Sequence, residues 1–172
     1  MAFRNMTVSV MVEIPKGSRN KYEYDKASGH IKFDRMLYSS VHYPSDYGFI
    51  FDTLAEDGDA LDALVLVWEQ TFPGCVIEAK PIGLFKMWDE KGPDAKILCV
   101  PVHDPFWNHI EKLSDMPPHL LKEITHFFSI YKELEGKKTG VEGWEDREEA
   151  VKVIKLARKR YKKSLTAKRR KK

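Results

Sequence analysis

Three carboxylates crowd into one short turn of this sequence, at Asp57, Asp59 and Asp62, within the run Asp-Gly-Asp-Ala-Leu-Asp. At a few ångströms' separation and an effective dielectric near 20, each like-charged pair costs roughly 4 kcal/mol. A cluster held at that spacing favours a compensating cation, and a hard divalent metal ion prefers such oxygen ligands. The alternative is an ordinary acidic hairpin turn with solvated carboxylates, because Asp-Gly is a common turn dipeptide.

A second acidic turn, Asp89-Glu-Lys-Gly-Pro-Asp-Ala-Lys96, joins two apolar stretches. Two acidic turns at strand ends can face each other, which strengthens the metal hypothesis. The spacing does not fit an EF-hand, which requires an acid at the fifth position of its loop, Gly at the sixth and Glu at the twelfth. Counted from Asp57, those positions hold Leu61, Asp62 and Trp68. A calcium-sensor module is therefore a weak alternative.

Charged and tyrosine side chains elsewhere in the chain could complement the two acidic turns. They are Glu13, Lys21, Glu23, Arg35, Tyr43, Tyr47, Tyr131 and Lys132. An arginine among apolar neighbours, such as Arg35, requires a multi-oxygen anion or a carboxylate. The two-residue period of a strand places Lys21 and Glu23 on one face. Each residue alone is also compatible with an ordinary ion pair or a core aromatic.

The composition is that of an ordinary globular protein, with 172 residues of which 42% are hydrophobic and 12% aromatic. That length predicts one domain with a substantial core, which we expect over residues 1–163. The sequence has no run of about 18 apolar residues and no signal-peptide pattern at its N-terminus, which predicts a cytoplasmic protein. Cys75 and Cys99 lie among apolar neighbours and are expected to be buried reduced thiols.

The formal net charge of +3 conceals an asymmetry along the chain. Residues 152–172 hold 12 of the 29 Lys and Arg residues and none of the 26 Asp and Glu residues, so residues 1–151 carry a net −9. A basic tail can bind nucleic acid, but such a run is more often a solvated helix end and a disordered terminus. We therefore expect a basic, disordered tail over residues 164–172, without nucleic acid as a partner.

Seven runs in the first two thirds of the chain are predicted strands, because they alternate or are rich in β-branched residues. They cover residues 7–14, 22–25, 31–37, 47–51, 63–68, 76–88 with an interruption near Pro81 and Gly83, and 96–102. Turn signals such as Asp-Gly and Gly-Pro separate these runs. The pattern predicts a closed or strongly curved antiparallel sheet.

Two helices are predicted in the last third of the chain. The first opens at Ser114 or Asp115, has two prolines in its first turn, carries Tyr131 on its apolar face and stops at Gly136. The second begins with Asp146 and Glu149 in capping-box spacing, and acids precede bases along it as the helix dipole prefers. Its apolar stripe consists of Ala150, Ile154, Ala157 and Tyr161.

Taken together, these residues follow a known pattern, and the chain closely resembles the soluble family I inorganic pyrophosphatases of the prokaryotic type. The matching motifs are Glu13-Ile-Pro, Lys21-Tyr-Glu23, Asp34-Arg35, Tyr43-Pro-x-x-Tyr47-Gly, Asp57-Gly-Asp59-x-x-Asp62, Asp89-Glu90 with Asp94-x-Lys96, and His126-Phe-Phe-x-x-Tyr131-Lys132-x-Leu-Glu135. They span nearly the whole chain in the family's order. One departure is Ala60, where the family signature commonly has proline, and this loosens the turn without removing a ligand.

The resemblance implies a mainly β, α+β fold: a five-stranded, closed antiparallel β-barrel of the OB type with two main C-terminal helices packed outside. It also implies a Mg²⁺ requirement, pyrophosphate as substrate and a homohexamer. The implied metal ligands are Glu13, Asp57, Asp62, Asp89 and Asp94. The implied substrate-binding residues are Lys21, Arg35, Tyr47, Lys96, Tyr131 and Lys132, with Glu23, Tyr43 and Glu90 in support. Asp59 is the expected general base and Asp94 the alternative.

Two other classes of protein compete with this interpretation. A nucleic-acid-binding barrel would need exposed aromatic and basic residues on its binding face, whereas this face would be lined by acids that repel phosphates. A purely structural metal-binding protein offers no reason for Lys21, Arg35 and Lys132 to converge on the acids. Release of phosphate from pyrophosphate in the presence of Mg²⁺ distinguishes the three classes.

Overall fold

The strands form where β-branched residues alternate or concentrate. In the computed structural model, which describes residues 6–169, the first strand buries Val8, Val10, Val12 and Ile14. The strands are β1 (Val8–Ile14), β2 (Asn20–Asp25), β3 (His30–Met36), β4 (Asp46–Ile50), β5 (Asp62–Val65), β6 (Val76–Asp89), β7 (Gly92–Pro93), β8 (Lys96–Pro101) and β9 (Gly140–Asp146).

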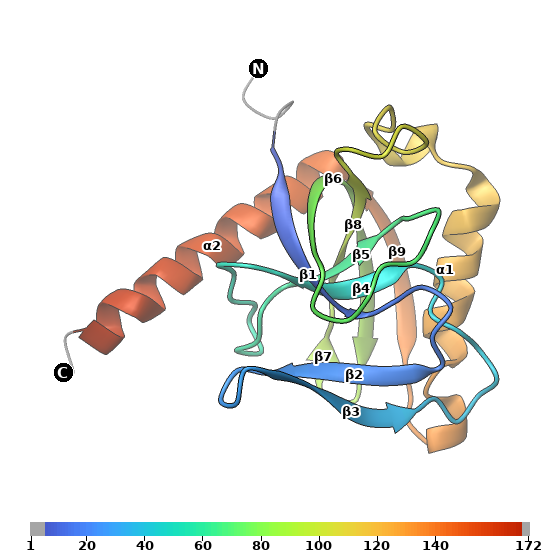
Figure 1. Cartoon of the computed structure of the whole chain (residues 1–172), viewed down its shortest axis with the longest axis horizontal. Coiled ribbons are helices and arrows are strands. Elements are labelled where there is room, and N and C mark those ends of the chain that lie inside the picture. Colours follow the sequence, from blue (N-terminus) through green and yellow to red (C-terminus); the bar gives the residue numbers. More distant parts are fainter. Residues whose placement is uncertain (1–5, 170–172) are drawn as a thin grey trace.

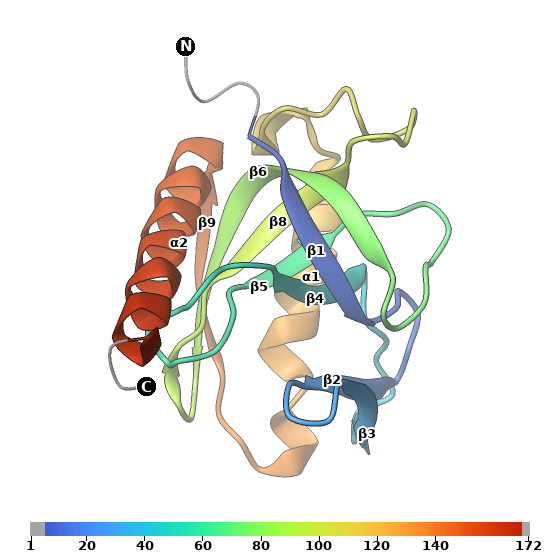
Figure 2. The ribbon, with the colours of Figure 1, turned by 60° about the vertical axis from the view of Figure 1, so that its left-hand side comes forward.

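Five of these strands pair in a closed ring, in the order β1, β4, β5, β8 and β6, and β6 returns to β1. The strands β2 and β3 form a separate hairpin, which lies across the lower end of the ring in Figures 1 and 2. Four of the five ring pairings are antiparallel, whereas β5 and β8 run parallel. The expectation of an entirely antiparallel ring was wrong for β5 and β8. The strand β6 lies between them in the sequence and runs antiparallel to β8, so the chain reverses direction twice and β8 runs the same way as β5.

The long strand β6 closes the ring because it bends. It pairs with β1 through its first residues, with β8 through its middle and with β9 through its last part, and its register with β8 shifts between Pro81 and Gly83. The predicted interruption at these two residues is therefore a bulge within one continuous strand, as expected where a sheet must curve. A side chain at position 83 would collide with Leu113, because a Cβ atom there would lie 2.4 Å from Leu113 Cδ2.

Two helices cover the strands on different sides, as Figures 1 and 2 show, and each closes its own apolar core. The helix α1 (Pro118–Ile130) contributes Ile124, Phe127 and Phe128 to the core that also contains Leu64 and Leu98. The helix α2 (Arg147–Arg169) packs its alanine and isoleucine stripe on the core formed by the alternate residues of β5 and β8. Both strands are thus buried on both faces, which explains their continuous apolar sequence.

The first helix is shorter than the sequence predicted. A 3₁₀ turn, η1 (Leu113–Asp115), precedes it, and α1 begins only at Pro118 because a residue before proline avoids the helical conformation. It ends at Ile130, and a second 3₁₀ turn, η2 (Glu133–Glu135), stops at Gly136 with a left-handed φ of 70°. Tyr131 and Lys132 therefore lie at the break between the two helical segments rather than on one continuous helix.

Two further differences concern the C-terminal third. The strand β9 was not predicted, because its sequence contains two glycines and the strand pairs with β6 at the edge of the sheet. One of these glycines is needed for packing, since a Cβ atom at Gly140 would lie 2.2 Å from the ring of Trp88. The helix α2 continues to Arg169, although disorder was expected from residue 164, and residues 170–172 lie outside the described part of the chain. Across residues 6–169, we find no helix of the length and apolarity needed to cross a membrane.

The tight pairing of β4 with β1 yields a stability prediction. A Cβ atom at Gly48 would lie 1.7 Å from the backbone oxygen of Met11, so Gly48→Ala should destabilise the protein by about 3 kcal/mol or more, the upper range for overpacking. Urea unfolding followed by circular dichroism measures this. The control is Gly29→Ala, where nothing lies within 4 Å and only a left-handed φ of 71° opposes the change, at about 1–2 kcal/mol. Equal losses would contradict the packing argument.

Candidate active site

A pocket of about 560 Å³ opens between the β2–β3 hairpin, the acidic turn before β5, the β6–β8 turn and the segment that follows α1. Its lining contains every side chain singled out from the sequence: Glu13, Lys21, Glu23, Arg35, Tyr43, Tyr47, Asp57, Asp59, Asp62, Asp89, Glu90, Asp94, Lys96, Tyr131 and Lys132. Residues up to 124 positions apart in the chain, Glu13 and Lys137, thus share one cavity. The structure establishes this placement, and the role of each residue is a separate question.

The ammonium group of Lys96 lies at the base of this pocket. Its Nζ atom donates to Asp62 Oδ2 and Asp94 Oδ1, both at 2.9 Å, and to the hydroxyl of Tyr47 at 3.0 Å. The side chain is 1% exposed. Burial alone would lower the pKa of Lys96, but the two carboxylates outweigh it and raise this pKa above its usual range. Lys96 is therefore a permanent cation at neutral pH.

Opposing influences act on the pKa of Asp94, the partner of Lys96. Burial raises its pKa, Lys96 opposes that rise, and the nearby carboxylate of Asp62 adds to it, with a net increase. Across the pocket, burial raises the pKa of Glu13 to about 7, although the backbone N–H of Tyr24 donates to its Oε1 at 2.8 Å. Carboxylates with raised pKa values are under-compensated by local protein cations, so additional positive charge would stabilise their ionised forms.

Three tyrosine hydroxyls face the same acids. Burial, followed by neighbouring charged or phenolic groups, raises the pKa of Tyr43, Tyr47 and Tyr131 above the usual range. The hydroxyl of Tyr47 donates to Asp62 Oδ2 at 2.5 Å. All three are thus protonated at neutral pH. Tyr131 can donate a hydrogen bond to an anion in the pocket, whereas the proton of Tyr47 is engaged by Asp62.

The first acidic turn is anchored on its inner side by Thr53, and its carboxylates are open to the pocket. The hydroxyl of Thr53 accepts the backbone N–H of Leu61 at 2.9 Å and donates to Ile50 O at 2.6 Å. Within the turn, Gly58 adopts a φ of 93°, which favours glycine, and Ala60 occupies the lining without a special backbone conformation. The carboxylates of Asp57 and Asp59 are exposed at the rim, whereas Asp62 lies deeper, against Lys96.

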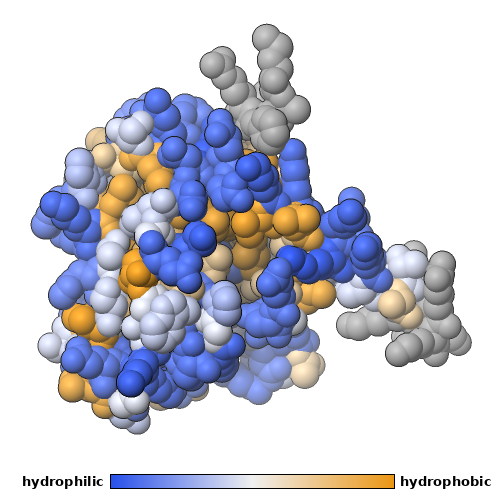
Figure 3. All heavy atoms as spheres, turned by 180° about the vertical axis from the view of Figure 1, so that it is seen from behind, coloured by the Kyte–Doolittle hydropathy of each residue, from blue (hydrophilic) through white to orange (hydrophobic). Residues whose placement is uncertain are grey.

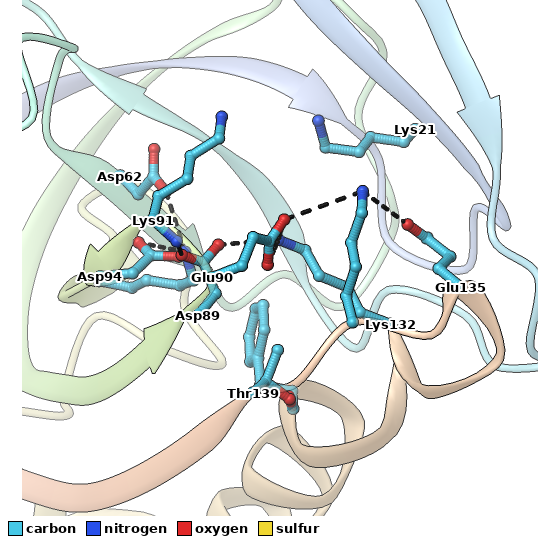
Figure 4. A network of polar contacts seen from close by, with 12 residues as sticks. Lys21, Asp62, Asp89, Glu90, Lys91, Asp94, Lys132, Glu135 and Thr139 are labelled. Carbon is cyan, nitrogen blue, oxygen red and sulfur yellow. Dashed lines mark hydrogen bonds and ion pairs between the residues drawn. The ribbon is translucent and has the colours of Figure 1, made fainter.

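The second acidic turn is held by Lys132, at the break after α1. Its Nζ donates to Asp89 Oδ2 at 2.8 Å and lies 3.4 Å from Glu90 Oε2. Figure 4 shows Asp62 and Asp94 side by side next to Asp89 and Glu90, with Lys132 and Glu135 on the other side. The side chains of Lys132 and Asp89 are 10% and 9% exposed, so water screens this pair little.

The β2–β3 hairpin supplies the cations on the opposite wall. Lys21 and Arg35 both contact Asp34, Lys21 at 3.1 Å and Arg35 through Nη1 at 2.5 Å, and Lys21 also contacts Glu23. Arg35 Nε donates to Glu135 Oε1 at 2.9 Å. The strand pairing brings Lys21 and Arg35 side by side, because they are register partners across the hairpin. The guanidinium of Arg35 is thus held at two of its edges, by Asp34 and by Glu135.

Sequence reasoning assigned no role to Asp34, Glu135 or Lys137. The first two appeared only as members of motifs, and their function as carboxylate partners of Arg35 required the structure. Lys137 lines the pocket and bridges Glu135 Oε2 at 3.2 Å and Glu90 Oε1 at 3.8 Å. The Gly-Lys-Lys run that follows η2 carried no signal that distinguishes this lysine from a solvated one.

The donor set of the pocket fits a divalent cation in its chemistry. Within residues 6–169, no three His, Cys, Asp or Glu side chains already converge as a ready metal site. The contacts explain this, because Lys96 forms ion pairs with Asp62 and Asp94, and Lys132 forms one with Asp89. The lining nevertheless holds nine carboxylates against seven Lys and Arg side chains, and carboxylate oxygens are the ligands that Mg²⁺ prefers.

Comparisons with known proteins agree on one family. A sequence model described as "Pyrophosphatase: Inorganic pyrophosphatase" matches residues 10–162. The chain is 65% identical over 153 residues to an inorganic pyrophosphatase of Methanosarcina acetivorans, covering 89% of this chain and 91% of that protein. It is 50% identical over 161 residues to one of Geobacillus stearothermophilus, covering 94% and 98%.

Solved structures agree with the sequence relatives. The crystal structure of inorganic pyrophosphatase from Thermus thermophilus matches with a TM-score of 0.89 at 43% identity, covering 94% of this chain and 99% of that one. An inorganic pyrophosphatase from Helicobacter pylori matches with a TM-score of 0.87 at 40% identity, covering 91% and 94%. The closed sheet with two helices is therefore the fold of these relatives as well.

The position of Lys96 generates a test of the pocket's charge balance. Lys96→Met should lower the free energy of unfolding by about 3 kcal/mol or more, because Asp62 and Asp94 lose their shared buried partner. Added Mg²⁺ should restore part of the loss by supplying the missing charge. Denaturant unfolding with and without Mg²⁺ measures both effects. Lys91→Met, an exposed lysine on the same turn, is the matched control and should change little. A loss that Mg²⁺ leaves unchanged would argue against a cation site here.

Proposed function

The chain belongs to the inorganic pyrophosphatase family, and from this premise we propose that it hydrolyses pyrophosphate to two phosphates by a Mg²⁺-dependent attack of water in the acidic pocket. The observation that carries the proposal is the meeting of two acidic turns with Lys21, Arg35 and Lys132 in a single cavity. A pocket lined by acids alone would suit a metal-binding protein, and one lined by bases alone would suit an anion-binding protein. Their combination suits a reaction in which metal ions and a polyanion bind together.

The charge of the pocket supports metal dependence. With nine carboxylates and seven cationic side chains, the lining has a formal net charge of −2 when all groups are ionised. Pyrophosphate is itself a dense polyanion, so it would be repelled unless cations entered with it or before it. Mg²⁺ ions bound by Glu13, Asp57, Asp62, Asp89 and Asp94 would neutralise the phosphates and lower the pKa of a bound water.

The cationic side chains are arranged to hold the two phosphates. Arg35 can present its guanidinium edge in a fixed plane, because Asp34 and Glu135 hold it from the other edges. Lys21 lies beside it on the hairpin, and Lys132 and Lys96 lie on the facing walls. Such preorganised donors stabilise charge that builds up on a departing phosphate.

The tyrosines add direction to this set. Because burial keeps the hydroxyls of Tyr47 and Tyr131 protonated, both remain neutral donors. Tyr131 can donate to a phosphoryl oxygen directly, and Tyr47 could do so once Asp62, which now accepts its proton, binds a metal ion instead. Tyr43 packs against the rings of Tyr47 and Phe127, with centroids 5.4 and 4.9 Å apart, and so supports the position of Tyr47. Glu23 and Glu90 support the lysines in the same way, through contacts with Lys21 and Lys132.

We assign proton removal from the attacking water to Asp59, with Asp94 as the alternative. The side chain of Asp59 is exposed on the turn and, among residues 6–169, has no hydrogen-bond or ion-pair partner, so its lone pairs are available to accept a proton. Asp94 is already engaged by Lys96 at 2.9 Å. A base that is free in the resting protein needs no ion pair to break before it acts.

The cellular setting and the assembly form part of the same proposal. We propose a cytoplasmic homo-oligomer, with the hexamer that the family resemblance implies. Exposed aromatic side chains support association: Trp68 and Phe106, 63% and 64% exposed, stack with ring centroids 5.4 Å apart, and Phe72 is 65% exposed. Large exposed aromatics grouped on loops are typical of surfaces that a second protein covers.

Removal of metal should abolish turnover. Phosphate release from pyrophosphate is expected to stop in excess EDTA and to return when Mg²⁺ is added, because the acidic lining then regains its counter-charge. Ca²⁺ should support slower turnover, since it prefers larger and more flexible coordination than Mg²⁺. Circular dichroism in EDTA controls for unfolding. Undiminished phosphate release without divalent ions would contradict the proposed mechanism.

The assignment of Asp59 is tested against a metal ligand in the same turn. Asp59→Asn should slow turnover by about 100-fold, typical for the loss of a general base, and leave Mg²⁺ affinity nearly intact. Asp62→Asn should weaken Mg²⁺ binding, because its carboxylate belongs to the proposed ligand set. Calorimetric Mg²⁺ titrations and steady-state kinetics on both variants measure the difference. If the two variants lose Mg²⁺ affinity equally, Asp59 is a ligand and the role passes to Asp94.

A further inference from the structure

A second hollow, of about 770 Å³, lies along α2 and shares no lining residue with the acidic pocket. It is lined by Met6, Lys155, Arg158, Lys159, Lys162, Lys163, Thr166 and Ala167. Five of these eight residues are cationic and none is acidic. Most residues that line the hollow are therefore basic, and the proposed hydrolysis does not use them.

Four of these cations form what we call the basic stripe: Arg158, Lys159, Lys162 and Lys163. Their spacing of three and four residues places them on neighbouring positions of one helix surface. Within residues 6–169, none of the four has an acidic partner within ion-pair distance. Other cations of the same helix do have one, since Lys152 contacts Glu149 at 2.8 Å and Arg160 contacts Glu56 at 2.6 Å.

The basic stripe is destabilising as it stands. Arg158 and Lys162, and likewise Lys159 and Lys163, are like-charged neighbours four residues apart. Each such pair costs a helix about 0.2–0.5 kcal/mol. The sequence places no acid between residues 152 and 172 that could relieve this repulsion. An anion bound across the stripe would relieve it.

The position of the stripe leaves it accessible. The residues with which α2 packs on the sheet end at Ala157, and Figure 1 shows the following part of the helix extending away from the strands. Figure 3 shows from behind that this part is mostly hydrophilic, whereas apolar residues come to the surface near its base. The stripe therefore lies on a part of α2 that projects from the molecule and does not pack on the sheet.

The chemistry of the stripe favours one kind of anion. A membrane-binding helix needs a continuous free apolar face, but α2 buries Ala150, Ile154 and Ala157 on the sheet. Its two exposed leucines, Leu156 and Leu165, lie on different sides of the helix and form no such face. A protein interface needs apolar or aromatic anchors at its centre, and Met6 is the only large apolar residue in the described lining. Binding to a nucleic-acid backbone needs only closely spaced cations that neutralise phosphates.

We propose that the basic stripe binds the phosphate backbone of nucleic acid without sequence preference. The sequence predicted a solvated helix end here, and the structure adds that these four cations lie together on one side of the helix without acidic partners among residues 6–169. The remaining chain, residues 1–151 with a net −9, repels nucleic acid and confines the contact to α2. Strand extension from nucleoside triphosphates releases pyrophosphate, so binding would place the enzyme beside a source of its substrate; this consequence rests on the proposed function, whereas the binding does not.

The experiment uses the full chain and a fluorescein-labelled DNA duplex of arbitrary sequence, about two helical turns long. Fluorescence anisotropy at about 50 and about 200 mM salt should show binding that weakens as salt rises. The triple variant Lys159→Gln, Lys162→Gln and Lys163→Gln should bind at least about 10-fold more weakly at the lower salt. Its salt slope should fall by about 2.7, which is about 0.9 for each phosphate that the variant no longer neutralises.

A matched control removes the same kind of charge elsewhere on the helix. The double variant Lys152→Gln and Arg160→Gln should change DNA binding far less, because those cations are already paired with acids. Pyrophosphate hydrolysis should stay unchanged in both variants, which separates this test from the proposed function. The proposal is overturned if the wild-type chain shows no salt-dependent binding, if the triple variant binds as tightly, or if poly-glutamate competes as well as unlabelled DNA.

Discussion

The buried ammonium of Lys96 between Asp62 and Asp94 is the interaction on which the rest of the site depends. Asp62 and Lys96 are direct register partners at the starts of β5 and β8, the one parallel pair in the ring. In a parallel pair both strands present their first residues at the same edge. The two acidic turns, one before each strand, are thereby brought to one edge of the sheet. The cation between them allows the acids to be buried together in the absence of metal.

The end of α1 is the second constraint. Because the α-helix stops at Ile130 and a 3₁₀ turn follows, Tyr131 and Lys132 face the acids while Glu135 turns toward the β2–β3 hairpin. Glu135 then reaches Arg35 from a position 100 residues later in the chain. A helix that continued to Gly136 would place Glu135 on the same face as Tyr131, four residues earlier, and not on the opposite wall. The break thus serves both walls of the pocket.

The distribution of charge divides the molecule into an acidic pocket and a basic helix end. Acids predominate in the part that forms the pocket, where most carboxylates are paired with a lysine or exposed at the rim, and Glu13 is held by the backbone N–H of Tyr24. The basic stripe, whose four cations have no acidic partner among residues 6–169, lies on the projecting end of α2. The small overall charge of +3 is the sum of these opposite regions and describes neither. Long-range attraction of anions therefore differs in sign between the two surfaces.

The sequence by itself determined which acids, bases and tyrosines are available to the pocket, because the types and order of residues are local facts that need no coordinates. Period-two alternation and β-branched runs likewise identified the ring strands, and the stripe at Ala150, Ile154 and Ala157 identified α2. Only the tertiary structure decided the parallel pairing of β5 with β8, the glycine-containing strand β9 and the partners of Arg35. These depend on contacts between residues far apart in the chain, which local propensity does not encode.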